Sequence, residues 1–195
     1  MAFDPRARNQ FGKDEYYTPT WVFDSLLRGM KPGIVQYLKE KGTVWESACG
    51  NGNLMRHIRK NGFKTIGSDM TPLAGGDPRG GHDFLKYQPH TFDIQVTNPP
   101  FSIKTEWIER SIKLGKPFCL LLPVNAMGGV GRMKLLKNYP LGIINVGRVR
   151  FENVDGVPYN GAPFDVAWFC TRELLRGPIL FEHKAKTVKD VKKTA

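Results

Sequence analysis

Short apolar runs and segments with apolar residues at helical spacing alternate along the chain. This alternation is typical of a parallel sheet that is covered by helices on both faces. The predicted strands span residues 43–48, 64–69, 92–97, 117–123, 143–151 and 164–171. The predicted helices span residues 20–27, 34–41, 54–60, 103–114 and 132–138.

The last two predicted strands are joined by residues 152–163, a connection too short for a crossover helix. Strands joined in this way pair antiparallel. The pattern therefore predicts an α/β fold whose mostly parallel sheet ends in an antiparallel hairpin. At 195 residues the chain has the length of one domain, which we expect to span residues 1–183 and to be followed by a basic tail at residues 184–195.

The net charge of the chain indicates what kind of partner it binds. The chain carries 29 Lys and Arg against 18 Asp and Glu, a formal net charge of +11. The tail at residues 184–195 accounts for +4, so the body of the chain still carries +7. An excess of this size favours a polyanionic partner, and nucleic acid above all.

Other features of composition exclude several classes of protein. The first residues lack the apolar segment of a secretory signal, and the longest apolar stretch, near residues 118–124, is far shorter than a membrane span. No Cys or His pair has zinc spacing. We therefore expect no metal. Because the cysteines are odd in number and lie in apolar contexts, they indicate reduced, packed thiols in a cytoplasmic protein. These cysteines are Cys49, Cys119 and Cys170.

The segment Asn98-Pro99-Pro100-Phe101 follows a predicted strand directly. Open α/β sheets bind their ligands at that end of a strand. The two prolines lack N–H groups and fix φ, and Pro99 also keeps Asn98 out of helical geometry. A stiff amide oxygen beside free carbonyls can accept the hydrogens of an amine, while Phe101 offers a flat apolar face. The segment therefore suits a planar group such as a nucleobase amine.

A second motif lies in the turn from the first predicted strand to the following helix. Gly50 and Gly52 allow this turn to be tight and to approach a ligand closely. Asp69 ends the second predicted strand, where nucleotide-binding α/β folds place a carboxylate on the ribose hydroxyls. Residue 55 is Met, so the full phosphate-binding fingerprint is absent. A ligand with ribose but no pyrophosphate fits better than NAD, and a solvated loop acid is the alternative for Asp69.

These motifs, in this order, resemble S-adenosylmethionine-dependent DNA adenine-N6 methyltransferases, in particular the compact enzymes of phages and prophages. The resemblance implies a Rossmann-like class I methyltransferase fold with a seven-stranded sheet, and S-adenosyl-L-methionine as cofactor. The implied catalytic residues are Asn98, Pro99, Pro100 and Phe101. The implied cofactor-binding residues are Tyr17, Thr18, Pro19, Glu46, Ala48, Gly50, Gly52, Asp69, Met70, Asp83 and Phe84.

Some of these residues have simpler interpretations. Asp83 is flanked by glycine, and acids in such positions commonly cap helices or turns. Tyr16 and Tyr17 are equally suited to packing, and Thr18-Pro19 is also a helix start signal.

The target adenine of a duplex must be flipped out of the stack or supplied single-stranded. The residues predicted to contact nucleic acid are Arg148, Arg150, Tyr159 and Asn160, with a solvated basic face as the alternative for the arginines. The loops at residues 125–132 and 152–163 are candidates for reading the target, and either is equally an ordinary surface loop. No separate target-recognition domain is expected after Phe101.

The leading hypothesis is methyl transfer from S-adenosylmethionine to the N6 amine of adenine in DNA. Cytosine N4, a base in RNA and, less well matched, a glutamine side chain are alternative acceptors. A nucleic-acid-binding protein that keeps this fold without turnover is the alternative from another class. The target sequence and the oligomeric state do not follow from the sequence.

Overall fold

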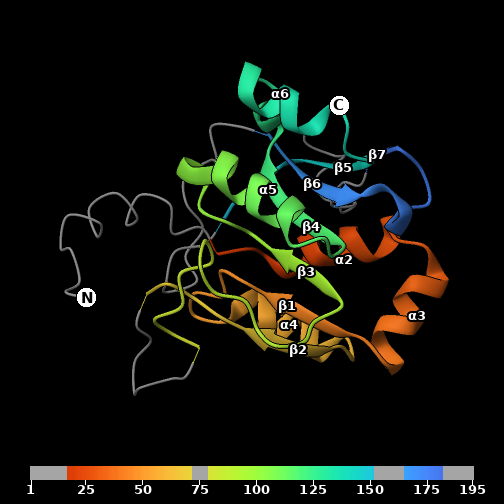
Figure 1. Ribbon diagram of the computed structural model, residues 1–195. Coiled ribbons are helices and arrows are strands. Elements are labelled where there is room, and N and C mark those ends of the chain that lie inside the picture. The colour runs from red at the N-terminus through yellow and green to blue at the C-terminus, as the bar shows by residue number, and fades with distance from the viewer. Residues whose placement is uncertain (1–16, 72–78, 152–164, 182–195) are drawn as a thin grey trace.

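The structure, a computed structural model, describes residues 17–71, 79–151 and 165–181. Its centre is a seven-stranded sheet with the strand order β2-β1-β3-β4-β6-β5-β7 (Figure 1). The strands are β1 (Thr43–Glu46), β2 (Lys64–Gly67), β3 (Ile94–Thr97), β4 (Phe118–Pro123), β5 (Leu141–Arg148), β6 (Asp165–Thr171) and β7 (Ile179–Phe181).

Strand pairing agrees with most of the predicted topology. β1 pairs parallel with β2 and β3, and β3 pairs parallel with β4. β6 is antiparallel to both β4 and β5, so the predicted antiparallel pair is confirmed. The sheet does not end on that pair, because β7 extends it as a parallel neighbour of β5. β7 is not among the six strands that the sequence pattern predicted. The total of seven strands therefore does not by itself confirm the seven-stranded sheet that the resemblance implies.

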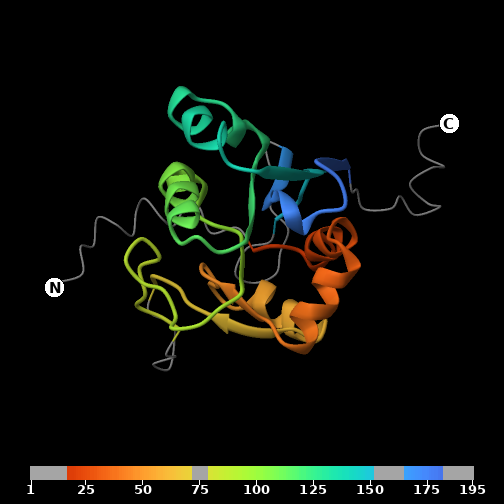
Figure 2. The ribbon, with the colours of Figure 1, turned by 45° about the vertical axis from the view of Figure 1, so that its right-hand side comes forward.

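All five predicted helices are present, with ends that differ from the predictions by a residue or two. Helices α4 and α5 connect parallel strands on the two sides of the β1–β3 pair, so right-handed crossovers place them on opposite faces of the sheet. Figure 2 shows α5 and α6 together, apart from α2, α3 and α4. The helices are α2 (Thr20–Gly29), α3 (Pro32–Glu40), α4 (Asn53–Lys60), α5 (Lys104–Lys113) and α6 (Val130–Leu136).

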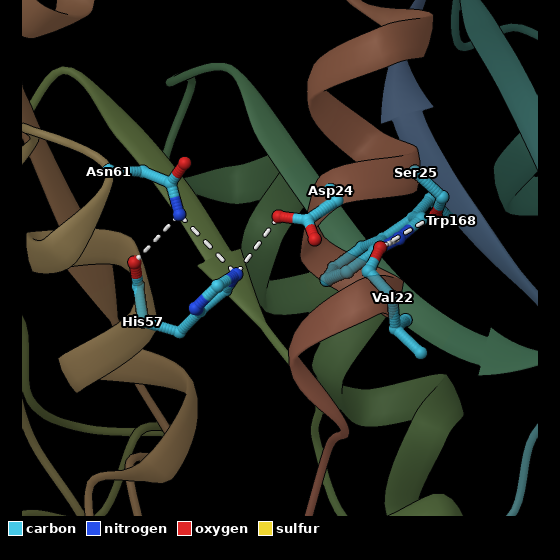
Figure 3. Close-up of polar contacts among 6 residues, drawn as sticks. All are labelled: Val22, Asp24, Ser25, His57, Asn61 and Trp168. Atoms are coloured by element: carbon cyan, nitrogen blue, oxygen red, sulfur yellow. Dashed lines mark hydrogen bonds and ion pairs between the residues drawn. The ribbon is translucent and has the colours of Figure 1, made fainter. Parts of the chain in front are cut away.

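Polar contacts fix α2 against α4 and the sheet (Figure 3). His57 Nε2 of α4 lies 2.9 Å from Asp24 Oδ1 of α2, and Asn61 Nδ2 donates to the His57 carbonyl oxygen at 3.0 Å. From β6, Trp168 Nε1 donates to the Val22 carbonyl oxygen at 3.0 Å. The start of α2 is therefore held in a defined place beside the sheet.

The core is one cluster of apolar side chains on both faces of the sheet. Its largest members include Trp45 of β1 and Trp168 of β6, both fully buried. A buried chain of hydrogen bonds crosses it, since Gln95 Nε2 donates to Ser47 Oγ and Ser111 Oγ donates to Gln95 Oε1. Among the described residues, no helix is long and apolar enough to cross a membrane.

Candidate active site

The candidate site lies where β1 and β3 end side by side. These strands are parallel neighbours, and the helices that follow them lie on opposite faces, which is the place where open α/β sheets bind their ligands. Glu46 is the last residue of β1, and Asn98 follows the last residue of β3. The two predicted motifs are therefore brought together at the switch point of the sheet.

The tetrapeptide links β3 to a short 3₁₀ helix, η2 (Phe101–Ile103), which leads directly into α5. Asn98 and Pro100 are half-buried, and Pro99 is buried. Pro100 has φ −56° and ψ 125°, so the chain stays extended until η2 begins. Lys104 Nζ donates to the Phe101 carbonyl oxygen at 2.9 Å, which fixes the end of the segment.

Phe101 is more enclosed than its place in the motif indicated. Its side chain is only 6% exposed, and its ring meets Phe151 in a T-shaped contact with centroids 6.0 Å apart. Phe151 follows β5, far from Phe101 in the sequence. The flat face that was expected to be open is therefore part of the core in this conformation.

A hydrogen bond of Glu46 links the strand before the glycine turn to the strand before the tetrapeptide. Its carboxylate is 1% exposed, and Thr97 Oγ1 donates to Oε1 at 2.7 Å. Burial raises the pKa of Glu46 to about 8 against the lowering effect of the Thr97 hydrogen bond, and the charge of Asp69 raises it further. Because Thr97 immediately precedes Asn98, the carboxyl at the end of β1, the strand that leads into the glycine turn, is bonded to the strand end that carries the tetrapeptide.

The glycine turn has the backbone geometry that only glycine adopts easily. Gly50 and Gly52 have φ of 46° and 82°, and Gly52 is the N-cap of α4. A Cβ at Gly52 would lie 2.9 Å from Arg79 Nη1, and one at Gly50 would lie 3.1 Å from Tyr17 Cε1. The side chains of Tyr17 and Arg79 thus lie close to the two glycines of the turn.

Asp69 lies just beyond β2, at the end of the strand that neighbours β1. Its Oδ2 accepts the Gly50 N–H at 2.7 Å, and its Oδ1 accepts the Thr71 N–H at 2.8 Å. The solvated loop acid is therefore not what the structure shows, because Asp69 is bonded to the glycine turn. Met70, the next predicted cofactor residue, is 39% exposed beside it.

The predicted amino-terminal part of the site is also placed at the glycine turn. The Tyr17 ring lies beside Gly50, and Thr18 is buried. Pro19 is the N-cap residue of α2, and no side chain caps this helix end. Thr18-Pro19 therefore marks a helix start, as the sequence indicated, while Tyr17 contacts the turn.

Asp83 and Phe84 take structural roles in this conformation. Asp83 Oδ1 accepts the Leu85 N–H at 2.9 Å, which is the turn-capping alternative. Phe84 is 1% exposed and stacks on Trp107 at a centroid distance of 4.1 Å. Its side chain therefore belongs to the core, a role that the sequence analysis did not assign.

Two of the predicted nucleic-acid contacts lie at the same edge of the sheet as the tetrapeptide. β6 is antiparallel to β4 and β5, so β5 and β4 run in the same direction and end at that edge. Arg148 ends β5, Arg150 follows it, and both are exposed; Arg148 Nε lies 3.7 Å from Asp165 Oδ1. Tyr159 and Asn160 lie outside the described residues.

Two residues of this site were missed in the sequence. In the sequence, Thr97 is only the last residue of an apolar strand. In the structure its hydroxyl donates to the carboxyl of Glu46, which lies 51 residues away in the chain. Arg79 lies across the glycine turn and its charge lowers the pKa of Glu46. Neither residue belongs to a motif, so only the tertiary structure reveals them.

Comparison with known proteins agrees with this site. The chain is 34% identical over 131 residues to the type II methyltransferase M.EcoRI of Escherichia coli, across 64% of this chain and 37% of that protein. The chain thus spans well under half the length of this relative. No family model matches the sequence.

Solved structures show the same fold. A class I S-adenosylmethionine-dependent methyltransferase structure from Listeria monocytogenes superposes with a TM-score of 0.55 and 15% identity, covering 89% of this chain and 67% of that one. A structure of a type I restriction-modification system gives a TM-score of 0.55 and 17% identity, covering 92% of this chain and 48% of that one.

The fold is therefore an α/β, Rossmann-like methyltransferase fold, as predicted. The sequence relative also confirms the resemblance to methyltransferases that the motifs indicated.

Proposed function

We propose that this protein transfers a methyl group from S-adenosyl-L-methionine to the N6 amine of adenine in DNA. The observation that carries the proposal is the Glu46–Thr97 hydrogen bond of 2.7 Å, because it joins the glycine turn to the strand that presents Asn98. A cofactor on the turn and an amine at Asn98 would be neighbours, as direct methyl transfer requires. The similarity to a type II methyltransferase supports the same reaction class.

The residues of the glycine turn fit S-adenosylmethionine. Gly50 and Gly52 present a turn without side chains, Asp69 stands beside Gly50 for ribose hydroxyls, and the buried Glu46 carboxyl suits an ammonium group. Tyr17 lies against the same turn. The cofactor, when bound, supplies an electrophilic methyl group on a sulfonium centre.

The tetrapeptide fits the acceptor amine. The lone pair of an adenine amine is delocalised into the ring, so the site must favour a tetrahedral nitrogen with developing positive charge. The Asn98 amide oxygen and the Pro99 carbonyl oxygen can accept its two hydrogens and direct the lone pair toward the methyl group. No general base is required before transfer, because the nitrogen becomes acidic only once it is methylated.

Stacking of the adenine on Phe101 requires a change from the described conformation. The Phe101 ring is 6% exposed and lies edge to face with Phe151. We propose that the base takes the place beside Phe101 after Phe151 shifts, so that the aromatic face stabilises the cationic nitrogen.

DNA is the proposed partner because the chain carries a net charge of +11 and its exposed Arg148 and Arg150 flank the edge that holds the site. In a duplex the adenine must leave the stack to reach Asn98, since its amine is paired. Tyr159 and Asn160 are proposed as further contacts. We also propose that residues 1–183 form one methyltransferase domain followed by the basic tail.

The test compares the parental protein with Asn98→Ala. Each is incubated with methyl-labelled S-adenosylmethionine and DNA, RNA or protein, and the labelled unit is identified after digestion. We expect N6-methyladenine from DNA and a loss of at least about 100-fold in Asn98→Ala, the scale of removing one transition-state hydrogen-bond acceptor or donor. Label in cytosine, RNA or protein alone would reassign the acceptor, and no Asn98-dependent label would indicate a binding protein.

A further inference from the structure

Three exposed apolar side chains follow one another in the segment just after β4. Met127, Val130 and Met133 are 41%, 67% and 52% exposed. Met127 ends the 3₁₀ helix η3 (Val124–Met127), and the other two lie one turn apart in α6 (Val130–Leu136), so they share a face of that helix. We call these three side chains the α6 ridge.

The α6 ridge is tied to the candidate active site. η3 begins where β4 ends, and β4 is the parallel neighbour of β3. Arg132 Nε donates to the Ala126 carbonyl oxygen at 2.9 Å, and its Nη1 donates to Thr105 Oγ1 at 3.1 Å. Thr105 lies in the first turn of α5, directly downstream of Phe101. Figures 1 and 2 show α5 and α6 side by side, so the ridge lies next to the helix that follows the tetrapeptide.

The surroundings of the α6 ridge carry more positive than negative charge. Residues 124–140 contain three Lys and Arg and no Asp or Glu, and the neighbouring helix α5 carries three Lys and Arg against Glu106 and Glu109. Lys134 in α6 and Lys137 directly after it are exposed. Duplex DNA matches this surface in two ways. Its phosphates complement the lysines, and its stacked bases complement the apolar ridge.

Base extrusion supplies a role for exposed apolar side chains. When a base leaves a duplex, its neighbours lose a stacking partner, which costs free energy. Proteins that deform DNA commonly insert apolar side chains, methionine among them, between base steps. Flexible methionine side chains adapt well to such an irregular gap.

We propose that the α6 ridge contacts the base stack of duplex DNA beside the extruded adenine, with Lys134 and Lys137 on the flanking phosphates. This inference rests on the proposed methylation of DNA. It assigns to the ridge the stabilisation of the flipped-out state, while Asn98 holds the flipped base.

The test is a triple variant, Met127→Ser, Val130→Ser and Met133→Ser, in the full chain. Because all three side chains are exposed, the thermal unfolding midpoint and the cofactor dissociation constant should stay close to the parental values. We expect kcat/KM on unmethylated duplex DNA to fall about tenfold, the effect of one lost apolar contact of about 1.4 kcal/mol. Tyr37→Ser is the matched control, since Tyr37 is 50% exposed on α3 at the opposite edge of the sheet, and it should leave kcat/KM unchanged.

A second substrate separates base extrusion from simple docking. Once the methylated site is located, the target adenine is placed opposite an abasic position, which weakens its pairing and lowers the energy of extrusion. The triple variant should recover to within about threefold of the parental rate on this duplex. An equal loss on both duplexes, parental activity on matched DNA, or a change in solution mass that reveals a self-association face would overturn the proposal. Absence of methyl transfer by the parental protein would instead overturn the proposed function.

Discussion

At the scale of single residues, Glu46 is the most informative side chain of the site. It is 1% exposed at the end of β1, and its carboxyl accepts hydrogen bonds from the Thr97 hydroxyl and the Ala48 N–H. A carboxyl in such a place favours its neutral form until a cation arrives. Glu46 therefore couples its own protonation, through Thr97, to the strand end that carries the tetrapeptide.

This coupling predicts a pH dependence of stability that is specific to Glu46. Burial raises its pKa from 4.5 to about 8 in the folded protein. Between these values the folded state holds a proton that the unfolded state has released, so the stabilising contribution is complete below the unfolded pKa and is lost as pH rises through the folded pKa. Glu46→Gln should remove this dependence, because its neutral amide mimics the protonated acid.

The measurement is urea unfolding of the parental protein and Glu46→Gln across roughly pH 5 to pH 8. The difference in free energy of unfolding between the two should shift in favour of Glu46→Gln as pH rises. Glu106→Gln, an exposed change on α5, should follow the parental curve. Parallel curves for the parental protein and Glu46→Gln would show that Glu46 is already ionised in the folded state.

At the scale of elements, the turn from β1 into α4 holds the site through its backbone. Gly52 has φ 82° as the N-cap of α4, and its Cβ position is already approached by Arg79. Gly33 in α3 differs in both respects, because nothing lies within 4 Å of its Cβ position and its φ is not positive. The chain thus offers a matched pair of glycines, one constrained and one free.

Gly52→Ala should lower the free energy of unfolding by about 1–2 kcal/mol, because an L-residue is strained at this φ. It should also weaken S-adenosylmethionine binding, since the turn that we propose to hold the cofactor must shift. Gly33→Ala should raise stability by about 0.5–1 kcal/mol and leave binding unchanged. Urea unfolding and titration calorimetry of both variants check this, and equal effects of the two substitutions would argue against a special role of the turn.

The elements themselves were largely predictable because each long apolar run has a clear period. All six predicted strands and five predicted helices are present, and the connection at residues 152–163 correctly indicated an antiparallel pair. β7 was missed because its three residues are too few to show a pattern. The side-chain roles of Phe84 and Phe101 were missed because their partners, Trp107 and Phe151, are brought to them only by the fold.

At the scale of the whole molecule, the strand topology gathers the predicted motifs at one edge of the sheet. The carboxyl ends of β1, β3, β4 and β5 meet at one edge, which holds the glycine turn, the tetrapeptide, the α6 ridge and the exposed Arg148. The opposite edge carries cations too, at Lys41 and Lys64. Net charge alone therefore does not say which edge faces DNA, and the position of the motifs is what distinguishes them.

The salt dependence of DNA binding can test this assignment directly. Each phosphate that a cation neutralises releases counterions, so the logarithm of the binding constant falls linearly with the logarithm of salt concentration, by about 0.9 per contact. The double variant Arg148→Gln and Arg150→Gln should weaken binding at low salt and reduce the magnitude of this slope by about two. The double variant Lys41→Gln and Lys64→Gln removes the same charge from the other edge and should leave the slope unchanged. Fluorescence anisotropy of a labelled duplex, titrated at several salt concentrations, measures both. Equal reductions for the two variants would mean that DNA is attracted by net charge rather than bound at the edge that carries Asn98.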